Sequence, residues 1–386
     1  MPILLFITKP IYVLLGFSFF AFSVQLYFYI RYYFEIAKKH RRERNNNELE
    51  SALPPVSVII CAKNESENIK KFLPSILEQD YPDYEVIVIN DGESTDLHAQ
   101  ITLLKEKYPH LRESFIPETA EVISRKKLAL TVGIKAAKNE LLLFTDADCQ
   151  AASKYWIRQM VKNFDEKTEV VLGYGAYFAQ NTFLSKLISY DTLFICIQYM
   201  GFAIKGHPYM GVGRNLAYRR SSFFQNKGFA GMLHLQSGDD DLFVNAIANK
   251  TNTKVEISPL SKTLSVPKQT FKQWITQRER HLSTSSLYKK STLTRIGFEV
   301  CSRGLFYVST LVCFFTCDIL CLIALGMLLI RWGIQALSIN LSAKALNERR
   351  FYLLIPLFDI LIPLLNLSIL IHNKIFYKKN HLYKWK

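Results

Sequence analysis

The feature that most constrains the fold is a short apolar run that ends in two carboxylates. Residues 141–149 read Leu-Leu-Leu-Phe-Thr-Asp-Ala-Asp-Cys, and Lys-Asn-Glu precedes them. A continuous apolar run of this length is typical of a buried strand in a mostly parallel sheet. Ligands of such sheets bind beyond the carboxyl ends of the strands, where Asp146 and Asp148 lie. Residues two apart at a strand end point the same way, so both carboxylates can converge on one divalent cation. A solvated turn with two surface acids is the simpler alternative.

The segments before this run alternate between strand and helix patterns. The apolar run 56–61 and the alternating run 85–89 predict two strands, each followed by a helical stretch. A weaker strand near Phe115 and a helical pattern over residues 127–138 then lead into the run at 141. This alternation predicts an α/β domain.

Acidic residues follow these predicted strands. Glu65 comes after the first strand, Asp91 after the second, and Asp146 with Asp148 after the fourth. The carboxyl ends of parallel strands meet at one edge of a sheet, so we expect these acids to form one site.

Three consecutive acids, Asp239, Asp240 and Asp241, open a later helical stretch. Carboxylates at a helix N-terminus are stabilised by the helix dipole, so capping is one interpretation. Three acids are more than a cap requires, and we hypothesise that one of them has a catalytic role.

A basic helix is predicted over residues 271–288, and it contains Gln277, Arg280 and His281. Such a helix can face solvent or lipid headgroups. Alternatively, it can bind a diphosphate, because arginine presents a fixed fork of hydrogen-bond donors.

Composition separates a membrane protein from a nucleic-acid-binding protein. Among 386 residues, 48 Lys and Arg oppose 33 Asp and Glu, and 49% of the residues are hydrophobic. The apolar residues concentrate near both ends and the basic residues flank them, which is the pattern of a membrane protein with cytosolic positive charge. No base-reading module is recognisable, so we expect no nucleic-acid partner.

Three apolar segments are long enough to cross a bilayer core of about 30 Å. They cover residues 11–30, 304–330 and 351–371. Basic residues at 38–44 place the following domain in the cytosol by the positive-inside bias. Residues 302–338 are also long enough for a hairpin of two helices. Without the hairpin the C-terminal region has two spans. With it the region has three spans, and the basic tail lies on the other side of the membrane.

A further apolar stretch, residues 182–204, contains Asp191. A crossing there would separate Asp146 from Asp239 by a membrane, so we expect a helix lying against the bilayer surface. The predicted organisation is a transmembrane anchor (1–33), a basic and polar linker (34–54), a cytosolic catalytic domain (55–290) and a C-terminal membrane region with a basic tail (291–386).

Five short motifs between residues 55 and 281 carry a family resemblance. In order, they are Lys-Asn-Glu, Asn-Asp-Gly, Thr-Asp-Ala-Asp, Gly-Asp-Asp-Asp and Gln-Arg-Glu-Arg-His. Their order resembles that of the membrane-anchored glycosyltransferases of family 2. These include ceramide glucosyltransferases and the cellulose, hyaluronan and poly-N-acetylglucosamine synthases.

The resemblance implies a GT-A nucleotide-diphospho-sugar transferase domain, with a mixed and mostly parallel sheet, that catalyses an inverting reaction. By position, Glu65 and Asp91 would hold the uracil and ribose of a UDP-sugar, and Lys126 would approach the phosphates or the nucleotide. Asp146 and Asp148 match the motif that binds Mn²⁺ or Mg²⁺ beside the nucleotide, with Asp148 the more direct ligand.

The resemblance also implies a general base among the three consecutive acids. Asp240 is the favoured position, Asp241 is the alternative, and Asp239 would face the diphosphate or acceptor. Inverting transfer needs one base for the acceptor hydroxyl, while a metal and basic side chains stabilise the leaving diphosphate.

The resemblance assigns Gln277, Arg280 and His281 to the diphosphate and acceptor. Two positions depart from the family pattern. His281 replaces a Trp, so the acceptor can differ from a glucan chain. Arg125 replaces the Gly before Lys126, which puts the contact of Lys126 with the donor in question.

The function expected from these residues is transfer of one sugar to a lipid or lipid-linked acceptor at the cytosolic face of the plasma (inner) membrane. A processive polysaccharide synthase, resembling poly-N-acetylglucosamine synthases, is the alternative. A catalytically inactive membrane scaffold is a third interpretation, disfavoured because every motif keeps its acids.

Overall fold

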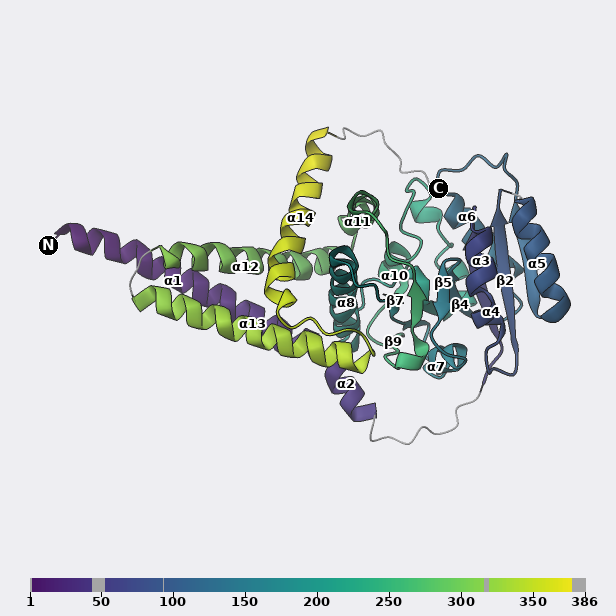
Figure 1. The fold of residues 1–386 in the computed structure, drawn as a ribbon, viewed down its shortest axis with the longest axis horizontal. Helices are drawn as coiled ribbons and strands as arrows, with labels where there is room; N and C mark the ends of the chain where they lie inside the picture. The colour runs from purple at the N-terminus through teal and green to yellow at the C-terminus, as the bar shows by residue number, and fades with distance from the viewer. Residues whose placement is uncertain (1, 44–52, 93, 316–318, 377–386) are drawn as a thin grey trace.

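The computed structural model describes residues 2–43, 53–92, 94–315 and 319–376. A sheet domain lies beside a group of long helices (Figure 1). Residues 44–52 of the predicted linker and the basic residues from 378 onward fall outside the described residues.

A seven-stranded mixed sheet forms the centre of the domain, in the order β3-β2-β1-β4-β8-β6-β9. The first four of these strands are parallel, whereas β8 is antiparallel to both β4 and β6. The strands are β1 Val56–Ala62, β2 Tyr84–Asp91, β3 Leu111–Ile116, β4 Leu141–Asp146, β6 Val170–Leu172, β8 Leu216–Arg219 and β9 Thr253–Val255. The runs at 56–61, 85–89 and 141–146 therefore form adjacent parallel strands, as predicted.

A second sheet of three short strands follows the carboxylates of β4. Its order is β5-β10-β7, with β5 Cys149–Ala151, β7 Gly175–Tyr177 and β10 Thr263–Ser265. Strands of three residues carry too little pattern to be found from the sequence.

Helices cover both faces of the large sheet, because side chains along a strand alternate between the faces. Val58 and Ile60 belong to one buried cluster, and Ile59 and Cys61 belong to the other. The helices of the domain are α3 Ser66–Phe72, α4 Pro74–Leu77, α5 Thr95–Lys107, α6 Arg125–Ala136, α7 Trp156–Val161, α9 Arg220–Gln225, α10 Asp241–Ile247 and α11 Phe271–Ser285. Short 3₁₀ turns are η2 Gly213–Asn215, η3 Ala230–Met232 and η4 Pro259–Ser261.

Helix α6 packs closely on the sheet at Gly133. A Cβ added there would come within 2.7 Å of Ile59 and Ile89, so only glycine permits this approach. The close contact brings the first turn of α6 to the edge where β1, β2 and β4 end.

Five described helices are long and apolar enough to cross a membrane by length and composition. The first is α1 Pro2–Phe28, which continues through the π-helical turn η1 Tyr29–Tyr33 into α2 Glu35–Glu43. The other four are α8 Phe183–Ile204, α12 Lys290–Phe314, α13 Ile319–Ala345 and α14 Leu354–Phe376. The predicted hairpin within residues 302–338 is present as α12 and α13.

Helix α8 was predicted to lie against the bilayer surface, and in the structure it is mostly buried inside the protein. It lies between the sheet domain and the long helices (Figure 1), and 72% of its apolar window is buried inside the protein. Asp191, near its middle, forms a buried ion pair with Arg278 of α11 at 3.0 Å. An apolar pattern alone does not distinguish burial in protein from burial in lipid, so the contact of α8 with a bilayer surface stays a prediction.

Candidate active site

The predicted acids gather at one edge of the sheet because the parallel strands end in register. Cys61 of β1 lies opposite Asp146 of β4, and Ala62 lies opposite Asn90 of β2. Asp148 follows in the turn between β4 and β5, where its Oδ2 accepts a hydrogen bond from Ser265 Oγ at 2.9 Å.

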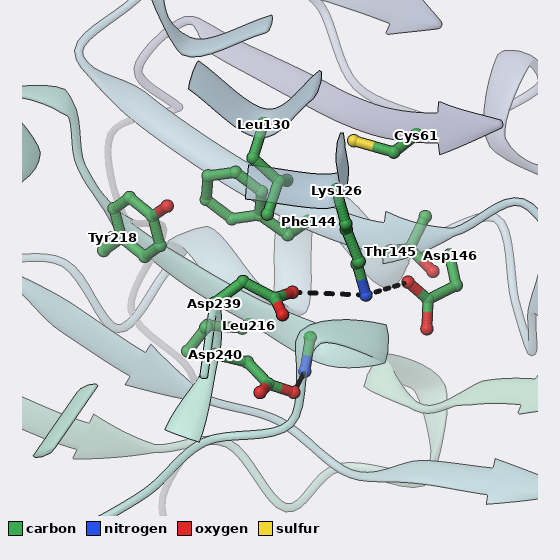
Figure 2. A pocket seen from close by; sticks show the side chains of 11 residues that line it. Cys61, Lys126, Leu130, Phe144, Thr145, Asp146, Leu216, Tyr218, Asp239 and Asp240 are labelled. Carbon is green, nitrogen blue, oxygen red and sulfur yellow. Dashed lines mark hydrogen bonds and ion pairs between the residues drawn. The ribbon is translucent and has the colours of Figure 1, made fainter. Parts of the chain in front are cut away.

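Lys126 of α6 connects two acidic segments that are far apart in sequence. Its Nζ lies 3.2 Å from Asp146 Oδ1 and 3.2 Å from Asp239 Oδ2, as Figure 2 shows. Burial opposes the charge of Lys126, but the surrounding carboxylates raise the pKa of its ammonium well above the usual value. The lysine is therefore a fixed positive charge, and 22% of its side chain is still exposed.

Asp146 stays ionised in this environment. Burial alone would raise its pKa, but Lys126, Arg214 and Arg280 outweigh burial and lower it. Arg214, in the 3₁₀ turn η2, also stacks on the ring of Tyr177, with its Cζ 4.3 Å from the ring centroid. The sequence analysis missed Arg214, although its place after Gly213 was a signal of a close backbone approach.

The three consecutive acids separate into different roles. Asp239 and Asp240 line a small cavity of about 20 Å³ together with Lys126 and Asp146 (Figure 2). Asp241 does not line it. Its Oδ2 accepts hydrogen bonds from Thr284 Oγ1 at 2.6 Å and from Tyr288 Oη at 2.9 Å, which connects α10 to α11 and the residues that follow it.

Asp240 is held as an acceptor at the N-cap of α10. Its Oδ2 accepts from the backbone N–H of Gly213 at 2.8 Å, and its Oδ1 accepts from the N–H of Asp241 at 2.7 Å. Burial, reinforced by the charges of Asp239 and Asp241, raises the pKa of Asp240 to about 7. A carboxylate with this pKa can take and return a proton near neutral pH.

Asp91 is not an open ligand site. It is 2% exposed, and its Oδ1 accepts from Arg125 Nε at 2.6 Å. The same guanidinium donates to three backbone carbonyls, those of Pro117, Glu118 and Ala120. The arginine that replaces the family's glycine is therefore committed to Asp91 and to the chain before α6.

Glu65 lies on a separate polar hollow of about 450 Å³. Asn68, Asp96 and Gln100 line it as well, so the hollow lies between α3 and α5. Burial raises the pKa of Glu65.

Helix α11 brings its three predicted residues, Gln277, Arg280 and His281, toward the site. Gln277 Nε2 donates to Tyr177 Oη at 3.3 Å, beside Arg214. Arg280 is near enough for its charge to lower the pKa of Asp146, in addition to the larger effects of Lys126 and Arg214. The side chain of His281 is exposed at the surface, yet desolvation and the charges of Arg280, Arg214 and Lys126 lower its pKa well below the usual value, so it also lies beside the site.

The residues of a divalent-metal site are present only in part. Within the described residues, no group of three or more His, Cys, Asp and Glu side chains could hold a metal ion. Asp146 and Asp148 supply two carboxylates, and Ser265 orients the second of them. Mg²⁺-type sites commonly combine one or two carboxylates with water and substrate phosphates, so this donor set fits such an ion together with a diphosphate.

Lys127, which the sequence analysis left without a role, fixes the segment before the three acids. It is 1% exposed, and its Nζ donates to the carbonyls of Met232, Leu235 and Ser237 at 2.7–2.8 Å. Ser124 Oγ donates to the carbonyl of Gln236 at 2.8 Å. We call residues 232–237 the acid-leading segment, because they end directly before Gly238 and Asp239.

Comparison with known proteins shows which family this part of the chain is similar to. Residues 57–225 match the family model described as Glycosyl transferase family 2. The chain is 30% identical over 174 residues to the poly-beta-1,6-N-acetyl-D-glucosamine synthase of Staphylococcus epidermidis, which is 44% of this chain and 40% of that protein. It is 28% identical over 249 residues to the probable glycosyltransferase YdaM of Bacillus subtilis, which is 59% of this chain and 54% of that protein. The chain thus spans about half or less of these relatives.

A solved structure supports the fold. The mannosyltransferase PcManGT from Pyrobaculum calidifontis, in complex with GDP-Man and Mn²⁺, superposes with a TM-score of 0.60 at 18% sequence identity. The match covers 95% of this chain and 100% of that one. The predicted GT-A fold is confirmed.

Proposed function

We propose that the protein transfers one sugar from a UDP-sugar to a lipid or lipid-linked acceptor. The premise is the match of residues 57–225 to the family 2 glycosyltransferase model. The observation that carries this proposal is the row Asp146–Lys126–Asp239, with Asp240 beside it, at the edge where the parallel strands end. It places a fixed cation and a carboxylate of raised pKa together in one small cavity.

Asp240 is the proposed general base. It takes the proton of the acceptor hydroxyl as that oxygen attacks the anomeric carbon, while the bond from that carbon to the diphosphate oxygen breaks. Attack from the face opposite the leaving group inverts the configuration at that carbon. Asp239 is less suited to this role, because its carboxylate is already paired with Lys126 at 3.2 Å.

Lys126 and Arg280 are the proposed partners of the leaving diphosphate, with Gln277 beside them. Asp148 and Asp146 would hold Mn²⁺ or Mg²⁺, and the ion would supply positive charge to the diphosphate oxygens. Asp146 is already in contact with Lys126, so Asp148 is the more available carboxylate.

The nucleoside is proposed to bind near Glu65, which lines the hollow between α3 and α5. Asp91 was expected to bind the nucleotide directly. Since its carboxylate is buried against Arg125, we instead assign it the role of fixing Arg125 at the rim of the site.

A lipid acceptor is favoured because the site adjoins the apolar helices. Arg278 of α11 bonds to Asp191 of α8 at 3.0 Å and to Asn366 of α14 at 2.9 Å, so the helix carrying Gln277 and Arg280 is attached to two of the five apolar helices. We further propose that the domain faces the cytosol at the plasma membrane, following the basic residues at 38–44.

A processive synthase is the second candidate, because curated relatives that match nearly half of the chain are poly-beta-1,6-N-acetyl-D-glucosamine synthases. Product size separates the two candidates: one added sugar on a lipid, or a polymer.

The test is nucleoside diphosphate release by the full chain in liposomes, screened over UDP-sugars and GDP-mannose with a total lipid extract as acceptor. Mn²⁺ is compared with EDTA, and products are analysed by mass spectrometry. Asp80→Asn is the matched control for acid substitutions, because Asp80 is half-exposed and lines neither the cavity of the acids nor the hollow at Glu65. Metal-dependent release with a new glycolipid supports the proposal. Binding of nucleotide without release from any donor would favour an inactive scaffold.

A further inference from the structure

Helix α14 has one apolar face that no described part of the protein covers. Leu357, Leu364, Leu367 and Leu370 are each about half exposed, at 47–55%. They recur at spacings of three and seven residues, which places them on one side of the helix. The opposite side is buried, with Phe358 at 0% and Ile362 at 8% exposure.

The direction of α14 differs from that of the other long helices. Helices α1, α12 and α13 run side by side as a bundle, whereas α14 crosses them near the sheet domain (Figure 1). Their own exposed apolar side chains, such as Phe19 at 63%, Val308 at 64% and Leu322 at 65%, mark the bundle as the part that spans the hydrocarbon.

Buried polar contacts fix α14 in this crossing position. Asp359 lies 2.6 Å from Arg331 of α13 and 3.5 Å from Arg303 of α12, and it also accepts from Tyr307. Farther along α14, Asn366 accepts from Arg278 of α11 at 2.9 Å. Attachment to the bundle at one point and to the domain at another prevents α14 from aligning with the bundle.

We propose that α14 does not cross the membrane but lies along the bilayer surface beside the sheet domain, with its leucine face in the acyl-chain region. A helix that crosses a membrane-spanning bundle must run roughly in the plane of that membrane. The protein-bound face of α14 is also apolar apart from the contacts of Asp359 and Asn366, so the leucine face is the part of the helix left to contact acyl chains. The inference rests on the apolar bundle and not on the proposed enzymatic activity.

The distribution of basic residues supports this placement. Lys344, Arg349 and Arg350 precede α14, and Lys378, Lys379, Lys384 and Lys386 follow it in the sequence. A crossing helix would put these two basic groups on opposite sides of the membrane. A surface helix keeps both on the side of the sheet domain, while the connection from α12 to α13, residues 315–318, carries no basic residue. Three crossings with a surface helix therefore satisfy the positive-inside bias at every segment.

The test measures membrane depth along two helices of the reconstituted full chain, in a background with the native cysteines replaced. Spin labels are placed at Leu357→Cys, Leu364→Cys and Leu370→Cys on α14. The matched controls are Leu322→Cys, Leu329→Cys and Leu337→Cys, exposed positions on α13. At 1.5 Å per residue, a crossing helix would change depth by about 20 Å between the first and last label of each set.

The expected result is a common, shallow depth for the three α14 labels and a steep depth change for the α13 labels. A steep change along α14 would overturn the proposal. A second measurement uses the native cysteines unchanged: a C-terminal epitope tag in sealed vesicles, compared with protease sites in the sheet domain. Cleavage of tag and domain from the same side is expected, and cleavage from opposite sides would refute the surface placement.

Discussion

Replacing Lys127 by methionine should release the acid-leading segment while leaving the sheet intact. Methionine keeps the length and apolar character of the buried stem, but it has no donor for the carbonyls of Met232, Leu235 and Ser237. The ammonium form alone provides three hydrogens for these three acceptors. Burial lowers the pKa of Lys127 to about 8, so this form predominates at neutral pH.

The size of the effect follows from the number of bonds. A hydrogen bond to a charged group contributes about 1.5–3 kcal/mol, and removing a buried ammonium also removes its desolvation cost. We expect a net loss of about 2–4 kcal/mol in the local stability of residues 232–237 from the three bonds. Since about 1.4 kcal/mol corresponds to a factor of ten, the open form of this segment should become roughly 30- to 1,000-fold more populated.

Hydrogen–deuterium exchange measures this directly, because exchange in residues 232–237 should accelerate while β1 and β4 stay protected. Transfer activity should fall more than donor affinity, since Asp239 and Asp240 follow this segment whereas Glu65 and Asp148 do not. Lys135→Met, an exposed change in the last turn of α6, is the matched control. Unchanged exchange in Lys127→Met would refute the reasoning.

Three further predictions concern the site and its support. The kcat/KM of the transfer should fall as pH drops below about 7, because Asp240 must be ionised to accept a proton. Asp239→Asn removes a neighbouring negative charge, so it should shift this acidic fall in the pH profile to lower pH. An unchanged pH profile would contradict the assignment. Asp148→Asn, whose amide oxygen can still accept from Ser265, should raise the Mn²⁺ concentration for half-maximal activity by about tenfold or more without changing thermal stability, and equal metal titrations would argue against a metal ligand. Arg278→Met should destabilise the protein by about 3–5 kcal/mol in thermal unfolding, because Asp191 stays buried without its cation, and adding Asp191→Asn should recover part of the loss.

The sequence predicted the parallel half of the sheet because its strands are continuous apolar runs. Residues 141–146 are almost entirely apolar up to the carboxylate, and a strand that is buried on both faces requires such a run. The family resemblance implied that Asp239 and Asp240 share a site with Asp146, whereas local patterns grouped only the acids at the strand ends.

The contacts of the α6 first turn could not be predicted. Arg125, Lys126 and Lys127 are adjacent basic residues, yet they bond to Asp91, to Asp146 with Asp239, and to the acid-leading segment, respectively. Which one faces the site depends on the rotation of α6 and on segments more than a hundred residues away. The choice between Asp240 and Asp241 depended likewise on Thr284 and Tyr288, which occupy Asp241.

The placement of the apolar helices was predicted least well. Composition identifies α8 and α14 as apolar, but it does not say whether protein or lipid covers them. Both are oriented by buried charges, at Asp191 and at Asp359, whose partners are on other helices. Only the tertiary structure brings those partners together.

The most direct test of the central claim is the transfer rate of Asp240→Asn, measured with donor affinity for the same preparation. The asparagine keeps the shape and one acceptor oxygen for the N–H of Gly213, so the cavity should persist. We predict unchanged nucleotide binding and a fall in turnover of about 100-fold or more, since general-base catalysis contributes about 10²–10⁴-fold. Turnover within threefold of wild type, particularly if Asp239→Asn abolishes it, would contradict the assignment of Asp240 as the base.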